Sequence, residues 1–384
     1  MGMLTDVVCW TPLLTDHQSH TFQALVKAEN IRLDVYVMRR QDALRTAQGW
    51  TETNVRDVEI RLIPNKSRLR YSVNKLRETC NSIHIFASPF ENKWMMLILF
   101  LATRMGLRVF LISESYATEA VGYLQEGNKF INLIKSLLRP LIYKMYGILY
   151  RKHIEGVFAI SPLAAQQYMA IGFKEDRVFP FGYFVPALNE HVIAKAPSLD
   201  TGICKIIFVG NLITTKGVDL IIEVAKKLYK SKVGVKIDVF GHGNPNDFNF
   251  DNAYIEYKGS IDFGYAQKEI ANYDFLVLPS RYDGWGVVVN EALLAGVPVL
   301  CSNRVGAGAI VRRWGCGSVY RIDIPDALHD LLSQLSRDSA IREEMKSAAL
   351  LVRTRLLPHV AADYMARAIM SCSSNLPKPK NPWY

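Results

Sequence analysis

The chain has 384 residues, 49% hydrophobic and 21% charged, a globular composition that excludes a disordered chain, a collagen-like repeat and a coiled coil. At about 150 residues per domain, this length predicts two or three domains. Lys and Arg outnumber Asp and Glu by 46 to 36, and the net charge of +10 favours anionic partners: phosphates, nucleic acid or an acidic membrane surface.

Cysteine usage and the length of the apolar runs favour a cytoplasmic protein. The six cysteines include no C-x-x-C pair, so zinc spacing and a secreted disulfide framework are not indicated, and buried free thiols are expected. The first ten residues lack the basic region of a signal peptide. The longest apolar run, 94–102, is far shorter than the roughly 20 residues that span a bilayer. We expect a protein that is at most peripheral, at the inner face of the membrane.

Short apolar runs alternate with helical patterns in the first half of the chain, which predicts parallel α/β layers. The runs lack polar alternation, so both faces of this sheet should be covered. Helices are expected at 17–27, 71–79 and 92–104. Strands are expected at 4–10, 33–37, 58–63, 83–87, 108–112 and 156–160.

The segment after Pro186 is polar and irregular, which predicts a domain boundary. We expect a first domain at 1–188, a linker at 189–201 and a second domain at 202–357. The C-terminal helix and tail at 358–384 should pack back on the first domain.

The α/β pattern starts again in the second domain. Strands are expected at 204–209, 235–240, 253–257, 275–278 and 297–301. Helices are expected at 218–229, 265–272, 287–295, 325–335 and 340–351. Two doubly wound domains predict a cleft between them, with ligands outside the carboxyl ends of the strands. Functional residues should therefore follow directly after strands.

The strongest local signal follows the strand at 275–278. A loop with Gly284 and Gly286 leads into a helix, and glycines there let backbone N–H groups approach an anion. If the whole segment were helical, Asp283 and Glu291 would lie roughly 12 Å apart on nearby faces. Two such carboxylates can accept hydrogen bonds from hydroxyls of an elongated polar ligand. The alternative is that Asp283 caps the helix and Glu291 faces solvent.

Two further loops of the second domain also follow strands. Gly210 and Asn211 come after the first strand, and Lys216 stands at the start of the next helix. An ammonium there suits a phosphate, although a surface lysine is the plain alternative. Gly241 opens a G-x-G after the second strand, a pattern that by itself indicates a turn.

This arrangement resembles the retaining glycosyltransferases of family 4, which have the GT-B fold and are counted among the glycosyl transferases group 1. The similarity covers about 203–351 and, more loosely, the first domain. It implies an α/β fold of two Rossmann-like doubly wound domains that face each other across a cleft. The family hallmark P-S-x-x-E-x-F-G-x-x-x-x-E-A-x-A-x-G-x-P-V reads here as Pro279-Ser280, Asp283, Gly286, Glu291-Ala292, Gly296 and Pro298-Val299.

The resemblance implies a site for a nucleotide-diphosphate sugar as donor. Lys216 should neutralise the diphosphate, Glu291 should hold the ribose, and Asp283 should hold the transferred sugar. The segment around Gly259 should face the base. The other donor-site positions are Gly210, Asn211, Gly241 and Gly284, together with the backbone amides of Trp285, Gly286, Val287 and Val288.

The second domain departs from the family pattern at three positions. Asn211 stands where an arginine is usual, so one positive charge near the phosphates is missing. Asp283 replaces a glutamate and is one methylene shorter, which puts the preferred sugar in doubt. Trp285 stands where phenylalanine is common, a milder change.

In the first domain the resemblance is weaker. His17 and His20 open a helix where many relatives carry a Gly-Gly loop, and they face either the cleft or solvent. Glu114 follows the strand at 108–112, where many relatives have a histidine near the reacting carbon, so it is a catalytic candidate beside Lys216 and Asp283. Tyr116 is a further candidate on the acceptor side.

The implied chemistry needs no cofactor and no metal. The chain contains no D-x-D pair for a divalent cation, so Lys216 and the helix-start amides should stabilise the leaving diphosphate. Retention then needs no enzyme nucleophile, since the departing phosphate can take the proton of the acceptor hydroxyl. A glycan or lipid-linked acceptor is expected, whereas no motif indicates nucleic acid.

The segment 129–152 is basic and amphipathic. Either it lies on an anionic membrane surface, or its apolar stripe packs into the core of the first domain; one helix can do both. Pro140 is expected to kink or split the helix. The basic residues are Lys129, Lys135, Arg139, Lys144, Arg151 and Lys152. The interleaved apolar residues are Phe130, Ile134, Leu137, Leu141, Met145 and Ile148.

Overall fold

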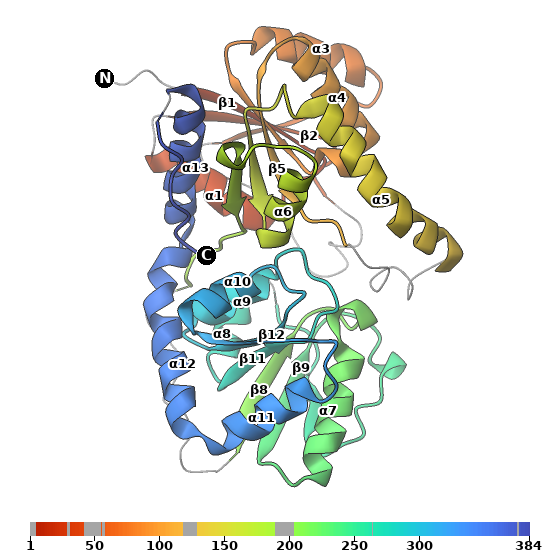
Figure 1. Cartoon of the computed structure of the whole chain (residues 1–384), viewed down its shortest axis with the longest axis vertical. Helices are drawn as coiled ribbons and strands as arrows, with labels where there is room; N and C mark the ends of the chain where they lie inside the picture. Colours follow the sequence, from red (N-terminus) through yellow and green to blue (C-terminus); the bar gives the residue numbers. More distant parts are fainter. Residues whose placement is uncertain are drawn as a thin grey trace. The chain divides into compact units, whose positions relative to one another are not determined.

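The computed structural model describes residues 5–28, 31–41, 55, 58–117, 129–188, 203–262, 264–374 and 376–384 (Figure 1). The chain forms two compact units. The first contains Met1–Tyr116, Leu137–Val185 and Leu357–Pro382, and the second contains Ala117–Ser136, Pro186–Leu356 and Trp383–Tyr384. The predicted linker at 189–201 lies outside the described residues.

The first unit is built on a parallel sheet with the order β3-β2-β1-β4-β5-β6-β7. The chain moves from β1 to β2 in one direction across the sheet and from β4 to β5 in the other. Right-handed connections therefore place helices on both faces, as the apolar strands predict. The strands are β1 (Thr5–Thr11), β2 (Ile31–Val37), β3 (Glu59–Leu62), β4 (Ile83–Ala87), β5 (Arg108–Glu114), β6 (Gly156–Ile160) and β7 (Val178–Phe181).

The C-terminal helix belongs to the first unit. It follows Pro186–Leu356 of the second unit in sequence, yet it packs along α1 and touches β6 (Figure 1). The helices of this unit are α1 (Asp16–Ala28), α3 (Arg68–Glu78), α4 (Lys93–Arg104), α5 (Lys129–Tyr150), α6 (Pro162–Ala170) and α13 (Pro358–Ser373), and α5 begins in residues grouped with the second unit.

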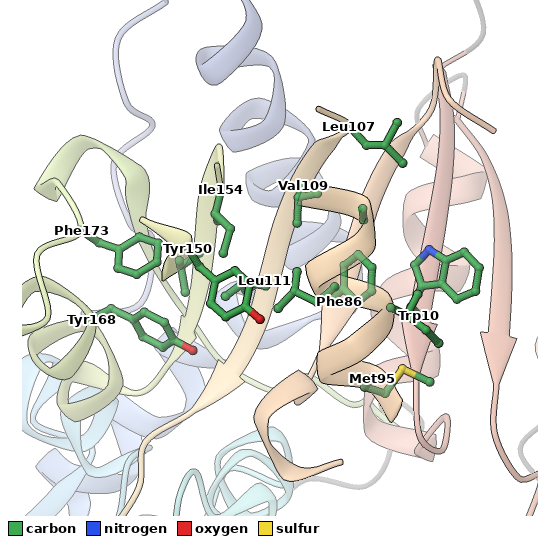
Figure 2. Close-up of a cluster of buried hydrophobic side chains, with 14 of the residues drawn as sticks. Trp10, Phe86, Met95, Leu107, Val109, Leu111, Tyr150, Ile154, Tyr168 and Phe173 are labelled. Atoms are coloured by element: carbon green, nitrogen blue, oxygen red, sulfur yellow. The ribbon is translucent and has the colours of Figure 1, made fainter. Parts of the chain in front are cut away.

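Large aromatic and aliphatic side chains fill the core between this sheet and its helices. Figure 2 shows Trp10, Phe86 and Leu111 from the strands beside Met95 and Tyr150 from the helices, all buried. Burial of this apolar surface fixes the sheet, and so fixes where the loops at its carboxyl edge begin.

A buried histidine links two strands of this core and makes stability depend on pH. His84 accepts a hydrogen bond at Nδ1 from the Trp10 indole at 3.1 Å, and Nε2 lies 3.0 Å from the Thr79 carbonyl. Burial lowers the pKa of His84 from 6.5 to about 4, so the unfolded chain binds an extra proton between these values. Stability should therefore fall as the pH drops through this window, by up to about 3 kcal/mol.

Urea unfolding at neutral pH and near pH 4.5 measures this effect. A His84→Gln variant keeps a donor for Thr79 without a titrating ring, so its stability should change less over the same window. Equal pH dependence in both proteins would contradict this role.

The second unit repeats the architecture. Its strands are all parallel, in the order β10-β9-β8-β11-β12-β13. Among the helices that cover this sheet, α7 packs against α11, and α9 contacts α8 and α12 (Figure 1). The strands are β8 (Cys204–Val209), β9 (Val235–Phe240), β10 (Ile255–Tyr257), β11 (Phe275–Leu278), β12 (Val299–Ser302) and β13 (Gly317–Tyr320). The helices are α7 (Val218–Lys230), α8 (Ala266–Ile270), α9 (Val287–Leu294), α10 (Gly308–Trp314), α11 (Ala327–Arg337) and α12 (Ser339–Val352).

Each sheet contains one point where the chain reverses its direction across the strands. In the first unit this point lies between β1 and β4, and in the second between β8 and β11. Loops that leave two such neighbouring strands diverge, and open α/β sheets bind ligands where they do. The two-domain α/β fold is therefore the one expected from the sequence.

The structure differs from the sequence-based elements in a few places. The short elements α6, α10, β7 and β13 were not predicted. Of the two effects expected of Pro140, a kink or a split, the split does not occur, because α5 is a single helix with Pro140 inside it.

All six cysteines are free thiols. Four are buried, and burial raises the pKa of Cys9, Cys204, Cys301 and Cys316 to about 12. Cys80 is exposed, contrary to the prediction that the cysteines are buried. Among the residues described, no helix has both the length and the apolarity needed to cross a membrane.

Candidate functional site

Lys216 and Asp283, which come from separate sequence motifs, meet at the switch point of the second sheet. Lys216 lies in the loop after β8 and Asp283 in the loop after β11, and these two strands are neighbours. The Lys216 Nζ donates to Asp283 Oδ2 at 2.6 Å. The lysine side chain is 27% exposed and the aspartate 12%, so an anion from solvent can still reach the ammonium.

The backbone around Lys216 has little freedom. Lys216 ends a short 3₁₀ turn, Thr214–Lys216, and Gly217 follows in the left-handed region with φ +80°. A Cβ on Gly217 would lie 2.1 Å from the carbonyl oxygen of Pro279. Only glycine allows this close approach between the two loops, so Gly217 fixes where Lys216 stands.

Arg281 ties the same two loops together and was not identified from the sequence. Its guanidinium binds both carboxylate oxygens of Asp219, at 2.7 and 2.6 Å, and donates to the Thr214 carbonyl at 2.5 Å. Its backbone N–H donates to the Thr215 carbonyl. Arg281 therefore positions the turn that carries Lys216. Its place directly after a strand, within the motif itself, was the available signal.

The start of α9 presents backbone N–H groups beside this pair. Gly286 is the N-cap with φ +87°, and no side chain caps the helix. The amides of Val287 and Val288, in the first turn, lack carbonyl partners within the helix, and the helix dipole adds positive potential there. The Trp285 ring is buried, and its Nε1 donates to the Asn290 side chain at 2.9 Å. The ring is therefore not available to a ligand, and the expected role of Trp285 can involve only its backbone amide.

The structure excludes the alternative offered for the two carboxylates, a helix cap and a solvated side chain, and also the condition under which their spacing was given. Asp283 does not cap α9, because the N-cap is Gly286 and the helix begins at Val287. For the same reason Asp283 and Glu291 do not share one helix, and the 12 Å spacing expected along a continuous helix does not apply. Glu291 lies on α9 and is partly buried, which excludes a fully solvated side chain.

Three predicted glycines form a row along the carboxyl edge of the second sheet. Gly210 follows β8, Gly241 follows β9, and Gly259 follows β10. Gly210 N–H donates to the Phe240 carbonyl at 3.0 Å, and Gly241 N–H donates to the Gly259 carbonyl at 2.9 Å. A Cβ on Gly241 would lie 1.7 Å from the Gly210 oxygen. A side chain is thus excluded at Gly241, next to Asn211, whereas nothing lies within 4 Å of a Cβ on Gly259.

In the first unit, a tyrosine joins two of the predicted residues. The Tyr183 hydroxyl donates to Glu114 Oε1 at 2.7 Å, and its ring lies 4.3 Å from the His17 ring between centroids. Glu114 ends β5, and Tyr183 follows β7. Tyr183 is buried, so it holds the Glu114 carboxylate in one orientation. No sequence motif pointed to Tyr183.

His20 and Tyr116 do not join this group. His20 Nε2 lies 3.1 Å from the Asp16 carboxylate, one helical turn away. The Tyr116 backbone is held by Gln167 through two hydrogen bonds, and its ring packs against Tyr143 at 4.3 Å. These contacts support the local structure.

Replacing Tyr183 with phenylalanine should lower the turnover number and should also lower the free energy of unfolding. The variant keeps the packing against His17 but loses the hydrogen bond that orients Glu114, a bond to a charged acceptor that contributes about 1.5–3 kcal/mol. Steady-state kinetics with acceptor in excess measures the loss. Tyr168→Phe is the matched control, because that buried hydroxyl has no hydrogen-bond partner among the described residues. Unchanged turnover in Tyr183→Phe would remove Tyr183 from the site.

Comparison with known proteins gives a match to a sequence family over part of the chain. Residues 193–351 match the family described as glycosyl transferases group 1. An uncharacterized glycosyltransferase of Methanocaldococcus jannaschii is 27% identical over 145 residues, which cover 36% of this chain. The matched part spans only 37% of the length of that relative.

Solved structures extend the likeness to the whole fold. WaaG, a glycosyltransferase involved in lipopolysaccharide biosynthesis, aligns over 93% of this chain and 98% of its own, with a TM-score of 0.61 and 16% identity. Anabaena HepE in complex with UDP aligns over 96% of this chain and 100% of its own, with a TM-score of 0.68 and 12% identity. At such low identity these matches concern the fold alone, which is the GT-B fold.

Proposed function

Because residues 193–351 belong to the glycosyl transferases group 1, we propose that this protein transfers a sugar from a nucleotide-diphosphate donor to an acceptor hydroxyl. The observation that carries the proposal is the meeting of Lys216, Asp283 and the start of α9 at the switch point of the second sheet. A cation, a carboxylate and unpaired amides are the groups that a diphosphate sugar requires.

Lys216 and the amides act on the leaving group. As the glycosidic bond breaks, negative charge grows on the diphosphate, and a fixed ammonium and helix-start N–H groups stabilise that charge more than they stabilise the ground state. Positive charge supplied in this way performs the task that a divalent cation performs elsewhere. The proposed reaction therefore uses no metal and no further cofactor.

Asp283 changes partner when the donor binds. In the free protein its carboxylate accepts from Lys216 at 2.6 Å, which keeps the ammonium in place and its charge balanced. A diphosphate competes for the ammonium, and the carboxylate then accepts hydrogen bonds from hydroxyls of the sugar. Glu291, on α9, accepts from the ribose.

We assign the acceptor hydroxyl to the first unit. Glu114, Tyr183 and His17 offer a carboxylate, a hydroxyl and an imidazole at the carboxyl ends of strands. We further propose that the anomeric configuration is retained, with the departing phosphate accepting the proton. In keeping with WaaG, a glycosyltransferase involved in lipopolysaccharide biosynthesis, the acceptor is a lipid-linked or polysaccharide precursor in cell-surface glycan assembly.

One observation favours a different class of function. Asn211 leaves the phosphate region with one cation fewer than the family pattern, which suits a protein that binds a nucleotide sugar without turning it over. Such a scaffold would be stabilised by a nucleotide sugar but would neither hydrolyse nor transfer it. A further alternative is the same sugar transfer onto a soluble small-molecule acceptor. Such an enzyme, unlike the scaffold, would turn the donor over in solution.

A panel of UDP-, GDP- and ADP-sugars tests the proposal. UDP-sugars come first because HepE, which has the same fold, was solved with UDP. Thermal stabilisation and release of the nucleotide diphosphate are measured with each donor, and NMR of the product gives the anomer. Thermal stabilisation by a donor without release of the nucleotide diphosphate would favour the non-catalytic scaffold. An inverted anomer in the product would contradict retention.

A further inference from the structure

The helix α5 has two faces of different character within the first unit. From Leu137 on, its buried face packs on the core through Tyr143, Tyr146, Gly147 and Tyr150. At 3.6 residues per turn, these positions fall within roughly 100° of the helix circumference. The remaining circumference faces away from the core.

The outward face is almost entirely apolar. Seven large side chains lie on it within roughly 140° of the helix circumference. The most exposed are Leu137 at 67%, with Leu141 and Ile148 at 63% each. The seven residues are Leu137, Leu138, Leu141, Ile142, Met145, Ile148 and Leu149. Soluble proteins rarely expose a contiguous apolar patch of this kind without a partner.

This exposure excludes one of the two uses that the sequence left open, the packing of the apolar stripe into the core. The stripe formed by Leu137, Leu141, Met145 and Ile148 does not pack into the core. The core contacts of α5 come from the tyrosines on the opposite face, whose spacing follows the same helical period. The side chains of Lys129, Phe130 and Lys135 lie outside the described residues.

The charges around the apolar face have one sign. Lys144, Arg151 and Lys152 are exposed beside or just beyond it. From 127 to 154 the sequence contains no Asp or Glu. An apolar stripe bordered by cations is complementary to a bilayer surface, whose acyl region is apolar and whose head groups can be anionic.

We propose that the outward face of α5, residues 137–149 with the flanking cations Lys144, Arg151 and Lys152, docks in the plane of an anionic membrane surface. The apolar side chains enter the boundary between head groups and acyl chains, and the cations contact lipid phosphates. Docking is independent of the proposed sugar transfer, so either one can fail without the other.

A second copy of the chain suits this face less well. In a symmetric dimer the same patch meets itself, which would bring the cations of one copy towards those of the other. No carboxylate in the segment would offset this repulsion. Anionic lipid turns the same charges into attraction, at about 1 kcal/mol for each basic residue near the surface.

Flotation with vesicles tests the proposal on the full chain. We expect the protein to float with phosphatidylcholine vesicles that contain phosphatidylglycerol, and much less with phosphatidylcholine alone. The double variant Leu141→Glu/Ile148→Glu removes apolar contact and adds repulsion, so its affinity should fall by about tenfold or more. Lys144→Glu/Arg151→Glu should weaken binding only to the anionic vesicles. Both pairs of side chains are exposed, so the fold should be unaffected.

Leu351→Glu is the matched control. Leu351 is 77% exposed on α12 in the second unit, so the same chemical change is made away from α5. It should float like the unaltered protein. Equal flotation of the α5 variants and this control would overturn the proposal, as would an unaltered protein that stays at the bottom with anionic vesicles. A dimer in sedimentation that Leu141→Glu/Ile148→Glu converts to monomer would also overturn it, in favour of a second copy. Donor hydrolysis without vesicles should be the same in all these variants.

Discussion

Lys216→Ala is expected to reduce kcat/KM for the donor by about 10²–10³-fold, the loss seen when one fixed donor to a developing anion is removed. The ammonium stands at the switch point of the second sheet, 2.6 Å from Asp283. Two contacts hold Lys216 in place: its backbone ends the turn at Thr214–Lys216, and its ammonium pairs with the carboxylate of Asp283. Lys216→Arg keeps the charge with a different shape and should restore only part of the rate.

Two measurements separate this loss from misfolding. Lys226→Ala removes an exposed lysine that pairs with Glu223 one turn away on α7, and it should have nearly normal kinetics. Thermal unfolding of Lys216→Ala reports any effect of leaving Asp283 unpaired. A Lys216→Ala protein that is folded and has normal kcat/KM would refute the donor site.

Gly217→Ala should lower the free energy of unfolding by more than about 2 kcal/mol, since the left-handed backbone alone costs an alanine about 1–2 kcal/mol. A Cβ would lie 2.1 Å from the Pro279 oxygen, so the loops after β8 and β11 must also move apart. Because Lys216 precedes this glycine, the displacement should weaken donor binding as well. Urea unfolding and donor titration measure the two effects.

Gly315→Ala is the control for backbone strain alone. Gly315 also has a left-handed backbone, with φ +63°, but nothing lies within 4 Å of its Cβ position. In the Gly315→Ala variant, the free energy of unfolding should fall only by the cost of the left-handed backbone, and donor binding should be normal. If Gly217→Ala is no less stable than Gly315→Ala and binds the donor equally well, the close contact between the loops is not needed.

The residues of the proposed donor half of the site could be selected from the sequence because their signals are local. Each strand there is a short apolar run. Gly210 and Gly241 directly follow strands, and Gly286 stands at the start of a helix. The acceptor half was less readable. Glu114 was identified by its position after a strand, but Tyr183, which orients it, lies in no motif and is 69 residues away.

The sequence by itself determined the two-domain α/β architecture, most strand positions and the residues of the donor motifs, since apolar periodicity and glycine placement act over a few residues. Only the tertiary structure decided which residues meet. It joined Lys216 to Asp283 across 67 residues and Arg281 to Asp219 across 62. It also turned the apolar stripe of α5 outwards, because the tyrosines on the other face fill the core. Such pairings depend on strand order and on competition for the core, and both are properties of the whole chain rather than of any segment.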